Sequence, residues 1–418
     1  MKKEEISAIL LEELKLAMGC TEPAALALAA ARAAGVLDDD VIKIHAKLSA
    51  NIIKNAKAVT IPNSDGMKGI KAALVLGALE GDASHGLAVF SHLSPDASKR
   101  AREWLETYPV ELEVLPGEEN LKIDLTLSGK DHTARVILER DHDHFSEVWR
   151  DHVCLESHPL EKDADRNPRK QLTLENIFDY VEGDIPEEVI RILKDQIHYN
   201  TAISQEGFKG GYGLDAGLTR RALDTGVRGR AVSAAAAGSD ARMGGSALPV
   251  VINFGSGNQG ITLSVPILEY AKENNVEEEK VLRSLCLSNL LSLRVKSGMG
   301  KLSAFCGAVS AATAAVASIS YMLGGTREEV YHTMINTLGN TGGIVCDGAK
   351  GSCAIKIVSA LDSAFLAYEL AQKGKHLTPG EGIIREDWEK TLDHYARLGM
   401  EGMHETDAVI LQMMLDEE

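Results

Sequence analysis

The sequence predicts an α+β fold: a smaller N-terminal α+β domain with a mostly antiparallel sheet, followed by a mainly helical C-terminal domain. Short segments of alternating or β-branched residues end near residue 140, and apolar residues at helical spacing dominate beyond residue 171. A polar segment with two prolines, 156–171, separates the two patterns. Because 418 residues suit two or three domains, we expect an N-terminal domain of residues 1–165 and a C-terminal domain of residues 166–418.

The N-terminal domain is expected to mix strands with helices. A helix over 3–18 ends at Gly19, and an Ala-rich helix begins after Thr21. We expect these helices, within residues 1–35, to pack on the C-terminal domain. Other helices are predicted over 70–81 and 97–108, and a hairpin turn at 128–131 joins the last two predicted strands. The strands are predicted at 41–47, 56–62, 85–90, 110–116, 121–129 and 132–140.

Helices and glycines characterise the C-terminal domain. Of the 38 glycines, 13 lie in 207–260 and 10 in 298–351. Glycine costs about 1 kcal/mol per helical position relative to alanine, so this concentration indicates either close helix packing and caps or backbone that runs close to a ligand. The helices are predicted at 186–204, 215–224, 262–274, 277–292, 303–323, 326–337, 353–373 and 399–416.

Composition excludes several classes of function. The chain has 61 acidic and 44 basic residues and a net charge of −17, so it repels phosphate backbones and anionic membrane surfaces. The uncharged stretches Met243–Leu268 and Leu302–Thr326 are rich in small and polar residues, unlike a membrane span. The first 19 residues form an amphipathic pattern and not a signal peptide. We expect a cytoplasmic protein that binds neither nucleic acid nor membrane.

Three cysteines in the C-terminal domain could bind metal. Cys346 and Cys353 are separated by six residues that include two glycines, and Cys306 precedes a helix of small residues. The alternative is that all three are small buried hydrophobic residues. No CxxC or HxxxH completes a structural zinc site, whereas iron–sulfur clusters tolerate varied spacing. Three thiolates on a four-iron cluster would leave one iron open to a substrate.

A fourth cysteine, Cys20, is expected at the N-terminus of the helix that begins after Thr21, with Thr21 as the predicted N-cap. The helix amides there favour a thiolate and lower the pKa of the thiol, while the nearby Glu22 opposes this. Such a thiolate could be a nucleophile, a metal ligand or a proton acceptor. A cysteine without a role in an interhelical turn fits the pattern equally well.

Two further motifs carry polar side chains. The segment GSGNQG (255–260) follows a predicted strand at 249–254 and matches a dinucleotide-binding pattern, but Pro266 follows within the next segment and no second parallel strand appears. We expect the GSGNQG segment to be a loop with exposed backbone N–H groups, which could bind a carboxylate or another small anion. The run Asp141 to His144 is predicted to be a solvated hairpin end.

Taken together, five motifs resemble the L-cysteine desulfidase family, which is related to the catalytic chain of iron–sulfur L-serine dehydratases. The resemblance spans nearly the whole chain and implies an oxygen-sensitive 4Fe–4S enzyme, independent of pyridoxal phosphate, that converts L-cysteine to pyruvate, ammonia and sulfide. The motifs are GCTEPAA (19–25), IPNSDGMKGI with LGALEGD (61–82), FGSGNQGI (254–261), KLSAFCGAV (301–309) and NTGGIVCDGAKGSCAIK (340–356).

The resemblance implies a role for each cysteine. Cys306, Cys346 and Cys353 would be the cluster ligands, Cys20 the proton acceptor, and the open iron would bind the thiol of the substrate. The resemblance also implies that the substrate is a small amino acid and that the protein forms a homodimer. We infer that the substrate carboxylate and amino group are held by two loops, through Ser256, Gly257, Asn258, Gln259, Asn63 and Ser64.

Two departures from the related serine dehydratases favour cysteine as the substrate. The last two cluster cysteines are farther apart in those enzymes, and their chains end in a cysteine-bearing tail that plugs the site, whereas no cysteine follows Cys353 here. Three alternatives stay open: an L-serine dehydratase of the same mechanism, a non-catalytic metal- or sulfur-binding protein, and a nucleotide-dependent oxidoreductase that uses GSGNQG.

Overall fold

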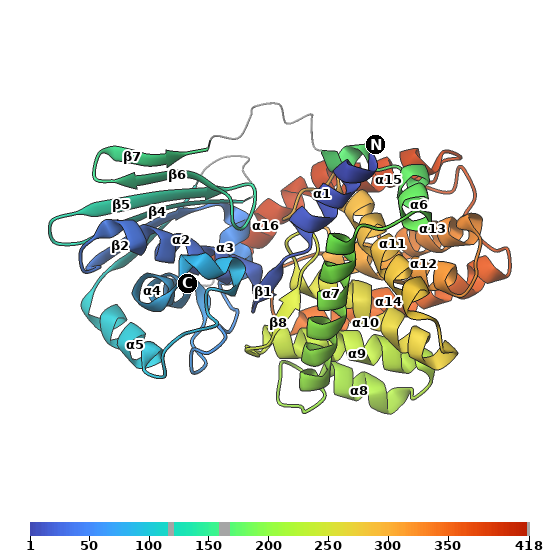
Figure 1. The fold of residues 1–418 in the computed structure, drawn as a ribbon, viewed down its shortest axis with the longest axis horizontal. Coiled ribbons are helices and arrows are strands. Elements are labelled where there is room, and N and C mark those ends of the chain that lie inside the picture. The colour runs from blue at the N-terminus through green and yellow to red at the C-terminus, as the bar shows by residue number, and fades with distance from the viewer. Residues whose placement is uncertain (116–120, 159–167, 416–418) are drawn as a thin grey trace.

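The protein has two parts that lie side by side (Figure 1). One part is a sheet with the helices that cover it, and the other is a larger bundle of helices. The computed structural model describes residues 1–115, 121–158 and 168–415. The predicted α+β, helix-rich fold class is confirmed. The predicted domain boundary at 165/166 lies outside the described residues. In the described ranges, no helix combines the length and the apolar character needed to cross a lipid bilayer.

Among the described residues, six strands form the larger sheet in the order β3-β2-β4-β5-β6-β7. Strands β2 and β3 pair in parallel and the other neighbours pair antiparallel, so the sheet is mostly antiparallel, as predicted. Ser128 faces Thr133 across the predicted hairpin. Alternate residues of β4 are buried, which packs one face of the sheet into the core. The strands are β2 (Lys43–Leu48), β3 (Val110–Val114), β4 (Lys122–Ser128), β5 (Thr133–Glu139), β6 (Phe145–Arg150) and β7 (Val153–Ser157).

Helices α2 (Thr21–Leu37) and α4 (Gly69–Glu80) lie against each other, and α2 also contacts β4 and β5. The short α3 (Ala50–Ala56) and α5 (Ala97–Thr107) complete this side. Two predicted strands are wrong. Residues 85–90 overlap a 3-10 helix, η1 (Ala83–Ala88), and 56–62 contain only an isolated bridge at Thr60. A few apolar residues between polar ones do not distinguish a strand from a short helical turn.

The chain begins on the helical side. In α1 (Lys3–Glu13), Ile6, Ile9 and Leu10 are buried in the core of the helical bundle. The predicted helix over 3–18 is wrong at its end, because β1 (Leu16–Met18) pairs antiparallel with β8 (Pro249–Val251). This two-stranded sheet lies at the junction of the two sides (Figure 1), where the chain passes from α1 on the bundle to α2 on the sheet side.

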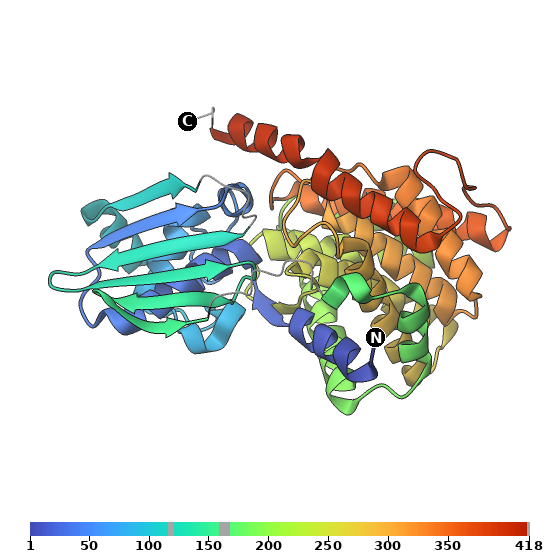
Figure 2. The same ribbon diagram turned by 90° about the horizontal axis from the view of Figure 1, so that it is seen from above.

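The bundle is built around α12, whose residues from Ala308 to Met322 are all buried. Helix α9 was missed by the sequence analysis, because its alanines, serines and glycines have no apolar period. Helix α16 extends from the bundle toward the sheet (Figure 2) and contacts α3, where Lys54 pairs with Asp407. The elements are η3 (Pro168–Gln171), α6 (Leu174–Glu182), α7 (Glu187–Gly207), α8 (Ala216–Leu223), α9 (Val227–Met243), α10 (Gly257–Asn274), α11 (Glu278–Lys296), α12 (Gly307–Met322), α13 (Arg327–Thr341), α14 (Ser352–Gln372), α15 (Trp388–Arg397), η4 (Leu398–Gly402) and α16 (His404–Leu415).

Candidate active site

One cavity is lined by four cysteines that are far apart in the sequence: Cys20, Cys306, Cys346 and Cys353. It lies where the start of α2 meets the starts of α10, α12 and α14. Its volume is about 100 Å³. A single water needs roughly 10–15 Å³ by the same measure, so the cavity has room for a small ligand.

Cys306 and Cys346 are held side by side by backbone hydrogen bonds. The N–H of Cys306 donates to the carbonyl of Ile344 at 3.0 Å, and the N–H of Cys346 donates to the carbonyl of Ala304 at 2.6 Å. The neighbouring Cys306 thiol lowers the pKa of Cys346 to about 6 against the effect of burial, with help from the charges of Lys54 and Lys356. The pair therefore holds one thiolate readily.

Cys353 lies in the first turn of α14, after a tight turn at Gly348. Gly348 has a φ of +98°, and a Cβ there would lie 2.5 Å from the carbonyl oxygen of Lys54. Only glycine allows this approach of the two backbones. Burial raises the pKa of the Cys353 thiol, and a negative charge on Cys346 raises it further.

The donor set at this cavity can be compared with the needs of different metals. Within residues 1–115, 121–158 and 168–415, no three His, Cys, Asp or Glu side chains come together as the ligands of a single metal ion. A four-iron cube places each thiolate on a separate iron, so its ligands lie farther apart than those of one ion. Three cysteines that line one cavity fit such a cluster in chemistry, since thiolates are the ligands it requires.

Cys20 lies at the N-terminus of α2, as predicted, and is 3% exposed. The N-cap residue is Cys20 itself and not Thr21, which is the first residue of the helix. Its thiol donates a hydrogen bond to a carboxylate oxygen of Glu22 at 2.9 Å. The expected lowering of its pKa is wrong: burial and the negative charge of Glu22 raise the pKa of Cys20 well above its ordinary value, although Arg242 acts in the opposite direction. The resting side chain is therefore a thiol.

Glu22 is held ionised by a buried histidine. His142 Nε2 lies 3.7 Å from the Glu22 carboxylate. Burial opposes ionisation of Glu22, but His142 and the Cys20 thiol outweigh it and lower the pKa of Glu22 to about 2. Neither ring nitrogen of His142 has a hydrogen-bond partner in the described part of the chain.

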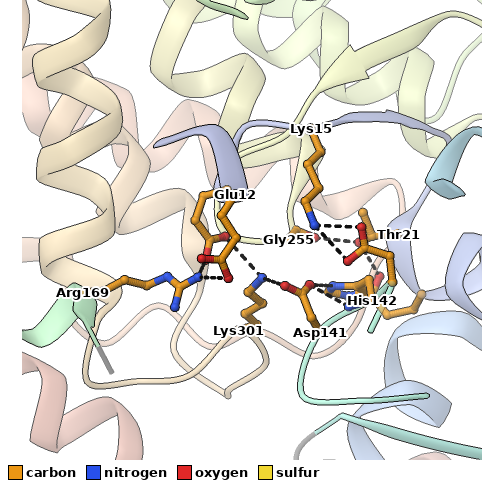
Figure 3. A network of polar contacts seen from close by, with 11 residues as sticks. Glu12, Lys15, Thr21, Asp141, His142, Arg169, Gly255 and Lys301 are labelled. Carbon is orange, nitrogen blue, oxygen red and sulfur yellow. Dashed lines mark hydrogen bonds and ion pairs between the residues drawn. The ribbon is translucent and has the colours of Figure 1, made fainter. Parts of the chain in front are cut away.

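The predicted solvated hairpin end at 141–144 is wrong for His142, which is fully buried. The turn between β5 and β6 reaches across to the bundle, where Lys301 donates to Asp141 at 2.6 Å (Figure 3). Lys301 also pairs with Glu13 of α1 at 3.3 Å, and Arg169 pairs with Glu13. Sequence spacing cannot reveal these contacts, because their partners are more than a hundred residues apart.

The predicted GSGNQG loop is in fact the first turn of α10. Ser256 is the N-cap, and its side chain accepts a hydrogen bond from the N–H of Gln259. Ser256, Asn258 and Gln259 line the cavity, and Gly257 lies between them. The Thr21 hydroxyl donates to the carbonyl of Gly255 at 2.8 Å, which fixes the start of α2 beside the start of α10.

Asn63 and Ser64 lie outside the lining of this cavity as the described residues form it. The Asn63 amide donates to the carbonyl of Phe90 at 2.9 Å, and the Ser64 hydroxyl donates to the carbonyl of Ile61 at 2.6 Å. Ser64 therefore stabilises its own turn, and Asn63 joins that turn to the segment at Phe90.

Three cationic residues to which the sequence analysis gave no role also line the cavity: Arg242, Lys296 and Lys301. Arg242 and Lys296 are nearly fully buried. Burial lowers the pKa of Lys296, while nearby Cys346 and Cys306 raise it. The only signal in the sequence was a basic residue inside a long stretch of small or apolar residues, which does not indicate where the side chain points.

Comparisons with known proteins cover nearly the whole chain. A family model described as serine dehydratase alpha chain matches residues 84–412. A UPF0597 protein of Lachnoclostridium phytofermentans is 43% identical over 98% of each chain. A UPF0597 protein of Treponema denticola is 41% identical over 99% of this chain and 98% of its own, and one of Finegoldia magna is 40% identical over 98% of each.

Proposed function

Because the chain belongs to the serine dehydratase alpha chain family, we propose that it is a lyase that converts L-cysteine to pyruvate, ammonia and sulfide with a 4Fe–4S cluster and without pyridoxal phosphate. The observation that carries this proposal is the lining of one cavity by four cysteines from four distant segments. Three of these cysteines could hold a cluster and the fourth could act as a base in the same site. Cysteines that merely fill a hydrophobic core have no reason to line one cavity.

Cys306, Cys346 and Cys353 are the residues that would hold the cluster. When bound, it would supply an iron with an open coordination position, a Lewis acid for the β-substituent of the substrate. Lys296 supports this assignment, because its buried charge interacts with both Cys346 and Cys306. A buried ammonium beside thiolates offsets part of the negative charge that they bring into the protein.

Cys20 is the proposed proton acceptor, and Glu22 is its proton partner. The Cα proton of an amino acid is weakly acidic, so its removal needs a base. The pKa of the Cys20 thiol is raised and that of the Glu22 carboxyl is lowered, so a free thiolate does not form in advance. The thiol proton moves to Glu22, 2.9 Å away, as the sulfur takes the Cα proton, and Glu22 then returns its proton to the departing sulfide. Both side chains end in their starting states, and the enamine product hydrolyses spontaneously to pyruvate and ammonia.

The first turn of α10 is the proposed seat of the substrate, through Ser256, Gly257, Asn258 and Gln259. Helix N-termini favour anions, because their unpaired N–H groups and the helix dipole both point at the ligand. The fixed contact between Thr21 and Gly255 would keep a substrate on α10 close to the start of α2, where Cys20 lies.

A second candidate, L-serine dehydration by the same mechanism, is favoured by the description of the matching family model. The two reactions use the same base and the same α-amino and α-carboxyl groups of the substrate. They differ in the leaving group, which is the thiol of cysteine or the hydroxyl of serine. Anaerobic reconstitution followed by parallel assays with L-cysteine and L-serine separates them. We expect a higher kcat/KM for L-cysteine. Pyruvate from serine alone would replace the proposal by the second candidate, and no product from either would overturn both.

A further inference from the structure

Arg242 is a buried cation that faces the cavity without a counterion. It lies in the last turn of α9, is 2% exposed, and lines the cavity with the four cysteines. No acidic side chain of the described residues forms an ion pair with it. A buried charge that lacks a partner is costly, so its retention here indicates that an anion binds beside it.

The unpaired atoms of Arg242 form one edge of its guanidinium group. Nη1 donates to the Asn258 side-chain oxygen at 3.2 Å. Nε and Nη2 are buried and have no hydrogen-bond partner among the described residues. The N–H bonds of these two nitrogens are parallel and lie along one edge of the planar guanidinium group, which is the arrangement that binds both oxygens of a carboxylate.

The position of this edge is fixed by a glycine and by α10. A Cβ on Gly257 would lie 2.3 Å from Arg242 Nε, so any larger residue would displace the guanidinium from the helix start. The N-terminal amides of α10 add to the positive potential at this point. The side-chain oxygen of Gln259, on the same turn, is a buried acceptor that also lacks a partner in the described chain.

We propose that Arg242 is the anchor for the substrate α-carboxylate, bound through Nε and Nη2, and that the Gln259 oxygen accepts a hydrogen bond from the α-ammonium group. This inference rests on the proposed function in that it names the part of the substrate that the site recognises. Arg242 and Cys20 line the same cavity, so the anchored substrate and the proposed proton acceptor share one site. A compound without an α-carboxylate is discriminated against by this pair.

The test compares L-cysteine with L-cysteinamide, which lacks the carboxylate charge, in the anaerobically reconstituted wild type and in Arg242→Gln. Two charge-assisted hydrogen bonds correspond to a preference of about 100- to 1,000-fold in kcat/KM for the acid. We expect the wild type to show it, Arg242→Gln to lose it mainly through a higher KM for cysteine, and Arg242→Lys to keep a part. Arg397→Gln, an exposed arginine of α15, is the control and should keep the preference.

Iron content distinguishes a substrate anchor from a structural residue. Arg242→Gln should hold as much iron per chain as the wild type. A preference for the acid that survives in Arg242→Gln, or a loss of iron in that variant, would overturn the inference.

Equilibrium binding of L-alanine and L-alaninamide separates this inference from the proposed reaction, because neither compound can undergo elimination. If alanine binding depends on Arg242 but the protein has no lyase activity, Arg242 is the carboxylate anchor and the proposed reaction is wrong. If the protein eliminates sulfide from cysteine but Arg242 does not affect the preference for the acid, the proposed reaction stands and the anchor is wrong. Equal binding of alanine and its amide to the wild type would reject the anchor.

Discussion

The thiol of Cys20 donates its hydrogen bond to the carboxylate of Glu22, with sulfur and oxygen 2.9 Å apart and both side chains buried. A thiol that has lost its proton to a neighbouring carboxylate becomes a base without contact with solvent. The pair therefore has a property that a single buried cysteine lacks: an acceptor for the proton that must leave.

Replacing Cys20 by serine should abolish turnover and leave the cluster in place. A serine hydroxyl is too weak an acid to become a base here, so kcat should fall by at least about 10²–10⁴-fold, the range typical for loss of a general base. Iron and sulfide analysis should match the wild type. Cys154→Ser, at an exposed cysteine of β7, is the control. If Cys20→Ser lost its iron, Cys20 would be a fourth ligand and the site would be closed.

Glu22→Gln should reduce kcat and shift its pH dependence. The amide keeps a hydrogen-bond acceptor but cannot take a proton, so we expect a loss of about 10²-fold. Because the charge of Glu22 raises the pKa of Cys20, its removal lowers that pKa. The remaining activity should then reach its plateau at lower pH than in the wild type. A pH–rate profile identical to the wild type would remove Glu22 from the mechanism.

His142→Asn tests the support for Glu22 from the hairpin between β5 and β6. His142 lowers the pKa of Glu22, so without it Glu22 takes up a proton at higher pH and is less available to Cys20. The acidic limb of the pH–rate profile should move to higher pH, with about tenfold lower activity for each unit of pKa change. His144→Asn, at a half-buried position two residues away, should leave the profile unchanged.

Serine in place of Cys306, Cys346 or Cys353 should lower the iron content after anaerobic reconstitution. A complete cluster corresponds to about four irons per chain, and each variant should fall well below that value and lose its brown absorbance. Cys286→Ala is the matched control, since Cys286 is a buried cysteine of α11 outside the cavity lining. Full iron content in all three serine variants would contradict the proposed ligand set.

Acid should destabilise the fold through Glu22 and Asp141. Each has a folded-state pKa of about 2, below the ordinary values of 4.5 and 3.8. The unfolded chain therefore binds more protons as the pH falls from near 4.5 toward 2, and stability present above this window is lost within it. The shifts correspond to about 3 kcal/mol for Glu22 and about 2 kcal/mol for Asp141. Urea unfolding of Glu22→Gln at pH 6 and pH 3 should show a smaller loss than the wild type.

The sequence predicts much of the fold because local patterns decide it. The antiparallel hairpin at Ser128 and Thr133 follows from alternation on both sides of a short turn, and most of the bundle helices follow from apolar spacing. Helix α9 escapes detection because Gly207 and Gly217 pack against the backbone of Ala237. Such a contact selects small residues and erases the apolar period.

The site is predictable only where a motif is continuous. The cysteines and the GSGNQG segment are visible as motifs, whereas Arg242 and His142 depend on contacts between elements that are distant in sequence. The pKa of Cys20 was misjudged because the sequence gives no measure of burial, which here outweighs the helix terminus. The domain division at 165/166, the homodimer and the cytoplasmic location stay predictions.

The most direct measurement follows iron, sulfide and pyruvate in one anaerobic sample of the reconstituted protein supplied with L-cysteine. We predict about four irons per chain and catalytic release of sulfide and pyruvate in equal amounts. A sample that carries its full iron and leaves cysteine intact would contradict the account, because the cavity would then hold metal without performing the elimination.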